Sequence, residues 1–195
     1  RMGIEVIKEM NRLGIVIDMS HSSEKSTLEA IEISSRPIAI THANPSFWHP
    51  AKRNKSESIL KRISESNGMI GFSLYPHHLK NSSNCELNNF CEMIAKTADK
   101  IGVKNLGIGS DLCQDQPDKI VEWMRNGRWT KVKDFGEGNI DNPGFPKQPS
   151  WFQNNNDFIN IHKGLEVVGF SPENIRDIMG INWFNFFKNS FSQKV

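Results

Sequence analysis

The chain has 195 residues, a formal net charge of +2 and three cysteines. This length can bury one sizeable core but falls short of the roughly 250 residues of a complete eight-stranded barrel of strand–helix units. With 24 basic and 22 acidic residues and no basic stripe, the composition excludes nucleic acid as an obvious partner.

The sequence shows no apolar run long enough for a transmembrane helix, and no basic-then-apolar leader opens it. Cys85, Cys91 and Cys113 form neither an even set nor a C-x-x-C pair. Their spacing therefore favours a reduced, cytoplasmic compartment over a disulfide framework, with a bridge between Cys85 and Cys91 as the alternative.

Helical and strand patterns alternate along the chain, as they do in β/α units around a parallel sheet. The predicted strands are residues 15–20, 38–42, 69–74 and 106–110. Helical spacing of apolar residues precedes the first strand and returns after each of the first three strands. We therefore predict an α/β fold of the (β/α)8 TIM-barrel type, with residues 1–195 forming roughly the C-terminal half of a single barrel.

Residues 112–156 differ from this pattern, because they are rich in proline and glycine and hold three of the five tryptophans. We predict a long loop excursion there, with a short helix near residues 118–125. Irregular stretches of this length are usually lids or binding loops, and a surface loop packed by its own tryptophans is an equal alternative. Beyond it, helical spacing returns, and Trp183, Phe184 and Phe187 are expected in the outer helical layer.

Three side chains that bind metals or move protons each follow a run of β-branched and apolar residues: His21, His42 and Asp111. In a barrel of parallel strands the carboxyl ends converge at one rim, so these side chains are expected to meet there. Neutral imidazole suits Zn²⁺, and an aspartate beside a metal-activated water can act as a general acid and base. The pattern predicts a metal-dependent hydrolase.

Two further residues are candidates at the same rim. Arg53 lies in the loop after His42 and can clamp a substrate carboxylate with two hydrogen bonds. Asp18, buried within its strand pattern, is a candidate for orienting a metal ligand. Each candidate also has a plain structural interpretation, such as a hydrogen-bonded histidine, a turn-capping aspartate or a solvated arginine. The pair His77-His78 is left out, since it follows a proline in a polar loop.

Four ordered segments resemble the renal or membrane dipeptidase family of zinc metallopeptidases. They are residues 11–23, 36–44, 52–54 and 107–111. The resemblance extends from residue 2 to about residue 187 and includes Gly180-Ile-Asn182, where the family has its terminal Gly-x-Asn.

The resemblance implies a barrel with two zinc ions that hydrolyses dipeptides. His21 and His42 would bind one ion. Arg53 would hold the substrate carboxylate, and Asp111 would transfer the proton.

The sequence departs from the family in two respects. The family's first strand supplies a His-x-Asp pair for the other ion, and a glutamate from a later strand bridges both ions. Neither has a counterpart here, so we expect the chain to start after them and to keep one partial zinc site. After its aspartate the family usually has aromatic-Asp-Gly, whereas here Asp111 is followed by Leu-Cys-Gln-Asp, which leaves the role of a second carboxylate open.

We therefore predict a fragment of a metal-dependent dipeptidase that is inactive alone. Half a barrel is expected to expose two unpaired sheet edges, and so to associate with itself or with a missing N-terminal half. One alternative is a non-catalytic binding module derived from the barrel. Another is a different barrel amidohydrolase that acts on a small amide.

Overall fold

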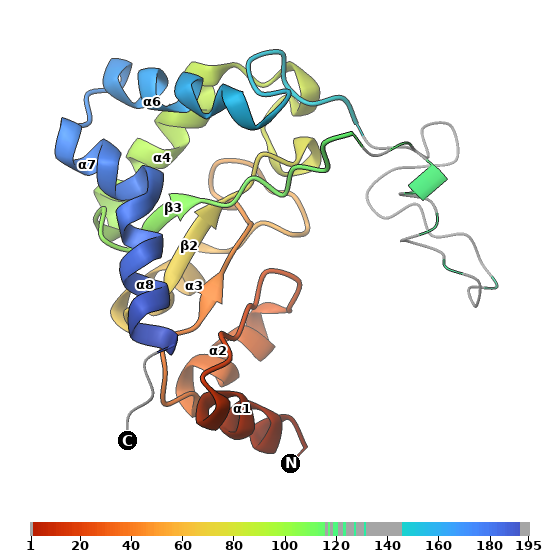
Figure 1. The fold of residues 1–195 in the computed structure, drawn as a ribbon, viewed down its shortest axis with the longest axis vertical. Coiled ribbons are helices and arrows are strands. Elements are labelled where there is room, and N and C mark those ends of the chain that lie inside the picture. The colour runs from red at the N-terminus through yellow and green to blue at the C-terminus, as the bar shows by residue number, and fades with distance from the viewer. Residues whose placement is uncertain are drawn as a thin grey trace.

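The computed structural model describes residues 2–115, 117, 119–120, 123, 127, 131 and 146–191 (Figure 1). Most of the predicted helix at residues 118–125 and most of the excursion at 112–156 lie outside the described residues. The N-terminal half of the structure contains α1 (Met2–Leu13), α2 (Glu24–Ile33), β1 (Ala39–Ile40), α3 (Glu57–Glu65), β2 (Met69–Phe72), η1 (Pro76–His78) and η2 (Ser82–Asn84). The rest of the chain contains α4 (Leu87–Ile101), β3 (Leu106–Ile108), η3 (Asn155–Asp157), α6 (Phe158–Val167), α7 (Pro172–Arg176), the π-helical turn η4 (Asp177–Ile181) and α8 (Asn182–Phe191).

The sheet is parallel, in the order β1-β2-β3, and helices connect its strands. This confirms the predicted α/β class and three of the predicted strands. The remaining predicted strand, at residues 15–20, is reduced to a single parallel bridge between Asp18 and Ala39. Two hydrogen bonds flank that bridge: Met19 N donates to Ala39 O at 2.8 Å, and Ala39 N donates to Ile17 O at 2.9 Å.

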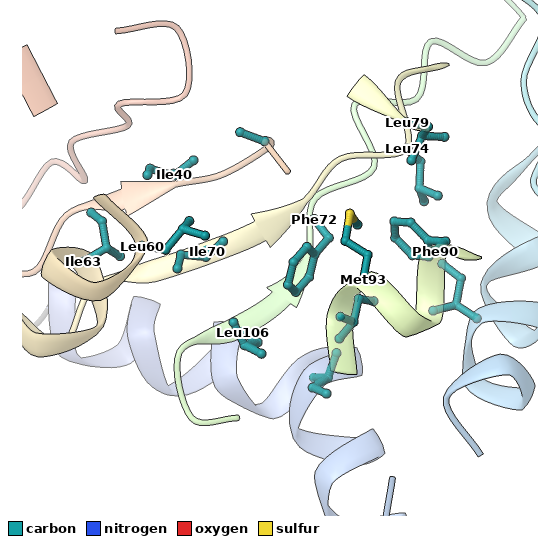
Figure 2. Packing of buried hydrophobic residues seen from close by; sticks show 14 of the residues in the cluster. Ile40, Leu60, Ile63, Ile70, Phe72, Leu74, Leu79, Phe90, Met93 and Leu106 are labelled. Atoms are coloured by element: carbon teal, nitrogen blue, oxygen red, sulfur yellow. The ribbon is translucent and has the colours of Figure 1, made fainter. Parts of the chain in front are cut away.

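The main core lies between the sheet and helices α3 and α4. Figure 2 shows Ile40, Ile70 and Phe72 of the strands packed against side chains of these helices. Ile63 of α3 and Phe90 of α4 are almost fully buried there. Both helices are amphipathic, so the apolar face of each is buried against the sheet. This burial stabilises the fold by about 25 cal/mol for each Å² of apolar surface removed from water.

The opposite face of the sheet is covered by α8. Ala39 and Met69 form a smaller buried cluster with Phe186, and Trp183 and Phe187 pack against it. Gly107 makes room for this contact, because a Cβ there would lie 2.4 Å from the indole nitrogen of Trp183. The sequence predicted that the aromatic residues of α8 pack in an outer helical layer, and Trp183 and Phe187 instead pack against the face of the sheet that carries Ala39 and Met69.

The two borders of the sheet differ. Along β3, the carbonyls that point away from β2 are capped by side chains of α8: Asn182 Nδ2 donates to Leu106 O at 2.8 Å, and Trp183 Nε1 donates to Ile108 O at 3.0 Å. Along residues 15–20 the border is open, and Ile15 is 47% exposed. The prediction of two unpaired edges is thus wrong for one of them, because a helix supplies the donors that a neighbouring strand would supply.

Cys85, Cys91 and Cys113 are free thiols, so the alternative disulfide between Cys85 and Cys91 does not form. Among the described residues, no helix combines the length and apolar character needed to cross a bilayer.

Replacing Asn182 with alanine is expected to lower the free energy of unfolding by about 1–3 kcal/mol, because the carbonyls of Leu106 and Val103 would lose a buried donor. Urea denaturation followed by circular dichroism measures the change. The control is Asn185→Ala at an exposed position of the same helix, which is expected to change stability by less than about 0.5 kcal/mol. Equal losses in the two variants would contradict the capping interpretation.

Candidate functional site

His21 and His42 lie side by side at the carboxyl end of the sheet. Their Nε2 atoms are 3.0 Å apart, and the ring centroids are 5.1 Å apart with an angle of 64° between the ring planes. The register explains the contact, because each histidine comes three residues after one partner of the bridge between Asp18 and Ala39. Parallel strands in that register deliver equivalent positions to the same point.

Asp111 follows β3 at the same end of the sheet, on a left-handed backbone with φ of 54°. Its carboxylate raises the pKa of His21, although burial and the positive charge of Arg53 outweigh this and hold that pKa below its ordinary value. Within the described residues, Asp111 makes no hydrogen bond or ion pair with the histidines or with Arg53. The structure therefore brings Asp111 into electrostatic range of the histidine pair but not into contact with it.

Arg53 reaches the same region from the loop after β1. Its Nε and Nη2 atoms are buried and have no hydrogen-bond partner among the described residues. An unpaired buried guanidinium is costly, so such a group normally meets an anion. Arg53 also lowers the pKa of His21 and of Lys55, in each case second to burial, so it lies within electrostatic range of both side chains.

A buried amide pair fixes the loop that carries Arg53. Asn44 N donates to Asn54 Oδ1 at 3.0 Å, and the side-chain amides of both residues donate to His78 O, at 3.1 and 3.0 Å. Asn44 also exchanges hydrogen bonds with the backbone of Ser73, which follows β2. These hydrogen bonds hold the loop against the sheet, so the backbone that carries Arg53 has a fixed position.

Asp18 is exposed, which corrects the expectation of a buried position. Residues 15–20 form the open border of the sheet, so the Asp18 side chain has no strand on its outer side. It nevertheless accepts four hydrogen bonds, from the backbone and hydroxyl groups of Ser20 and Thr41. The protein around Asp18 removes part of its hydration, which acts to raise its pKa, but these hydrogen bonds outweigh that effect and hold the pKa below its usual value.

Sequence reasoning missed two neighbours of the site. His78 is 1% exposed, and its pKa is lowered to about 3 by burial and then by the charges of Arg53 and His42. Lys55 is also buried and donates from Nζ to Ser22 O at 2.7 Å. One signal for Lys55 was available in the sequence. It lies two residues after Arg53 in a short basic run, so the loop that was expected to deliver Arg53 could also deliver Lys55 to the site.

The histidine pair fits a metal, but only in part. Two nitrogens bound to one tetrahedral zinc lie about 3.4 Å apart, so the 3.0 Å spacing needs to open by only a few tenths of an ångström. Among the described residues there is no cluster of three or more histidine, cysteine or carboxylate side chains able to hold an ion. This chain thus offers two imidazole ligands that face each other.

A parallel α/β sheet with paired imidazoles at its carboxyl end is typical of the barrel metallohydrolases. The sequence profile of the membrane dipeptidase family, Peptidase family M19, matches residues 1–125. The chain belongs to this family, which confirms the resemblance seen in its motifs.

Relatives and solved structures agree with that assignment. Dipeptidase tcpJ of Claviceps purpurea is 25% identical over 181 residues, which cover 92% of this chain and 36% of that protein. An amidohydrolase from Pseudomonas aeruginosa is 27% identical with a TM-score of 0.87, and the match covers 98% of this chain and 57% of that one. A metallo peptidase from Rhodobacter sphaeroides, liganded with a phosphinate mimic of the dipeptide L-Ala-D-Ala, has the same fold at 21% identity and a TM-score of 0.75, over 96% of this chain and 46% of that one. The chain therefore spans about a third to little more than half of the length of these proteins.

Replacing His78 with glutamine is expected to change how stability depends on pH. The folded protein keeps His78 neutral down to about pH 3, whereas the unfolded chain binds a proton near pH 6.5. The stability linked to this group is therefore fully present above pH 6.5 and is lost as the pH falls toward 3. Between about pH 7.5 and 5, the native protein should lose about 2 kcal/mol more of its unfolding free energy than His78→Gln, as measured by urea titration at each pH. Parallel pH profiles would show that His78 is not the group responsible.

Proposed function

We propose that this chain carries half of the active site of a zinc-dependent dipeptidase. The observation that carries the proposal is the approach of His21 Nε2 to His42 Nε2 at 3.0 Å, at the carboxyl end of a parallel sheet. Two imidazole nitrogens that face one point from neighbouring strands are a metal-binding arrangement, and membership of the membrane dipeptidase family supports the same chemistry.

The roles follow from position and charge. His21 and His42 would hold one zinc ion, which when bound acidifies water and polarises a carbonyl. Asp111, on the same rim, would take a proton from the attacking water and return it to the leaving amine.

Arg53 would bind the free carboxylate of the dipeptide. The buried Nε and Nη2 atoms of its guanidinium lack a partner among the described residues, and a carboxylate can accept a hydrogen bond from each of them. The dipeptide mimic bound to the Rhodobacter sphaeroides metallo peptidase supports a substrate of this class. A substrate without that carboxylate would leave Arg53 buried and unpaired.

Two protein ligands hold a divalent ion weakly, because catalytic zinc sites usually have three. We therefore propose that the remaining ligands come from other β/α units of the barrel and that the 195-residue chain alone is inactive. Release of amino acids from dipeptides by the purified chain alone, at a rate abolished by a chelator, would contradict this part of the proposal.

Zinc binding by the purified chain is the first test. We expect weak binding that His21→Ala or His42→Ala each reduces by at least about tenfold, since one nitrogen remains. Competition against a chromogenic chelator measures the affinity. The control is His162→Ala on α6, whose ring lies beside Glu166 at 3.7 Å and not beside the histidine pair, and which should leave the affinity unchanged. A chain that binds no zinc would instead favour the alternative of a non-catalytic binding module.

Hydrolysis by a barrel in which this chain is completed by N-terminal β/α units is the second test. We expect chelator-sensitive cleavage of dipeptides, and a loss of about 10- to 100-fold in kcat/KM for Arg53→Ala, because a charged hydrogen bond is worth about 1.5–3 kcal/mol. Lys52→Ala, at the exposed neighbouring position, is the matched control. Dipeptides with an amidated C-terminus should be cleaved equally by Arg53→Ala and its parent. A zinc-loaded, completed barrel that cleaves no dipeptide would refute the proposal.

A further inference from the structure

A hydrogen-bonded chain runs from Asp18 through Thr41 to His42. Thr41 Oγ1 donates to Asp18 Oδ2 at 2.7 Å, and the same oxygen lies 2.8 Å from His42 Nδ1. A hydroxyl has one proton, and an ionised carboxylate only accepts. Because the Thr41 proton is directed to Asp18, the contact with His42 requires that Nδ1 of the imidazole carries the hydrogen and donates it to Thr41.

This direction decides what His42 presents to its neighbour. A neutral imidazole has a single N–H, so a hydrogen on Nδ1 leaves a lone pair on Nε2. Nε2 is the atom that faces His21 at 3.0 Å. The lone pair therefore points at the place where a ligand nitrogen is needed, before any ion arrives.

The anchor at Asp18 is firm. Its carboxylate also receives hydrogen bonds from Ser20 N and from Ser20 Oγ, and Ser20 Oγ accepts in turn from His42 N at 3.1 Å. Ser20 is fully buried. The network thus joins the two segments that carry the histidines and restrains the backbone of one of them.

The two histidines are not equivalent in this respect. His21 follows Ser20 as His42 follows Thr41, but among the described residues the ring of His21 hydrogen-bonds only to His42. His21 is therefore free to change its tautomer when an ion binds, whereas His42 is held.

We propose that Thr41 is a positioning residue that, anchored by Asp18, fixes the ring and the Nδ1–H tautomer of His42 so that Nε2 is preset as a metal ligand. The inference rests on the proposed function only in assigning the lone pair on Nε2 to a metal ion. The tautomer itself is a property of the metal-free chain.

The test is a ¹⁵N–¹H correlation spectrum of the metal-free chain with labelled histidine, at a pH where histidine is neutral. The His42 signals are assigned by their loss in His42→Gln. We expect the Nδ1–H form in the native chain and in Thr41→Ser, and the Nε2–H form in Thr41→Val. Asp18→Asn should also give the Nε2–H form, because an amide that donates to Thr41 would turn its hydroxyl toward His42.

Zinc affinity is the second readout. Thr41→Val is expected to weaken binding by about 10- to 100-fold, and Thr41→Ser to restore it. Thr97→Val, which removes a buried hydroxyl that bonds a helix carbonyl in α4, is the control and should change neither readout.

The outcomes separate the two proposals. An Nε2–H form in the native chain, or an Nδ1–H form retained in Thr41→Val, would overturn the positioning role whether or not zinc binds. The expected tautomers in a chain that binds no zinc would support the positioning role and overturn the proposed function. Expected tautomers with equal zinc affinity in Thr41→Val and its parent would overturn the role of Thr41 in metal binding.

Discussion

The register between residues 17–19 and β1 is the constraint on which the site depends. Asp18 pairs with Ala39 in parallel, and three residues further on each segment places a histidine. Because side chains alternate between the faces of a sheet, a slip of one residue would turn one imidazole away from the other. The same pairing brings Thr41 beside Asp18, so one bridge sets both the contact and the network behind it.

The sequence supported prediction of the fold class because its patterns are local. Runs such as residues 69–72 and 106–108 are apolar along their length, as strands buried on both faces are, and amphipathic helices separate them. The same logic placed His21, His42 and Asp111 at one end of the sheet. The direction of the strands was enough to predict that these three side chains lie at the same rim, and no distance was needed.

Other features depend on contacts that a linear pattern does not record. Asp18 was expected to be buried because it lies within an apolar strand pattern, yet that segment is the border of the sheet. The role of α8 was missed for a similar reason, since nothing local distinguishes a tryptophan that packs an outer layer from one that donates to a strand carbonyl 75 residues away. Lys55 and His78 enter the site through tertiary packing, and their altered pKa values depend on burial that only the folded chain creates.

The unequal borders of the sheet have a consequence for assembly. With Asn182 and Trp183 occupying the β3 side, a second copy of this chain can add a strand only beside residues 15–20, and closure of a barrel would require α8 to release the β3 carbonyls. Two copies that met through that side would use up the available backbone groups of both. Such a pair could not recruit a third copy by strand addition, so self-association by this route stops at a dimer rather than running on into a fibre.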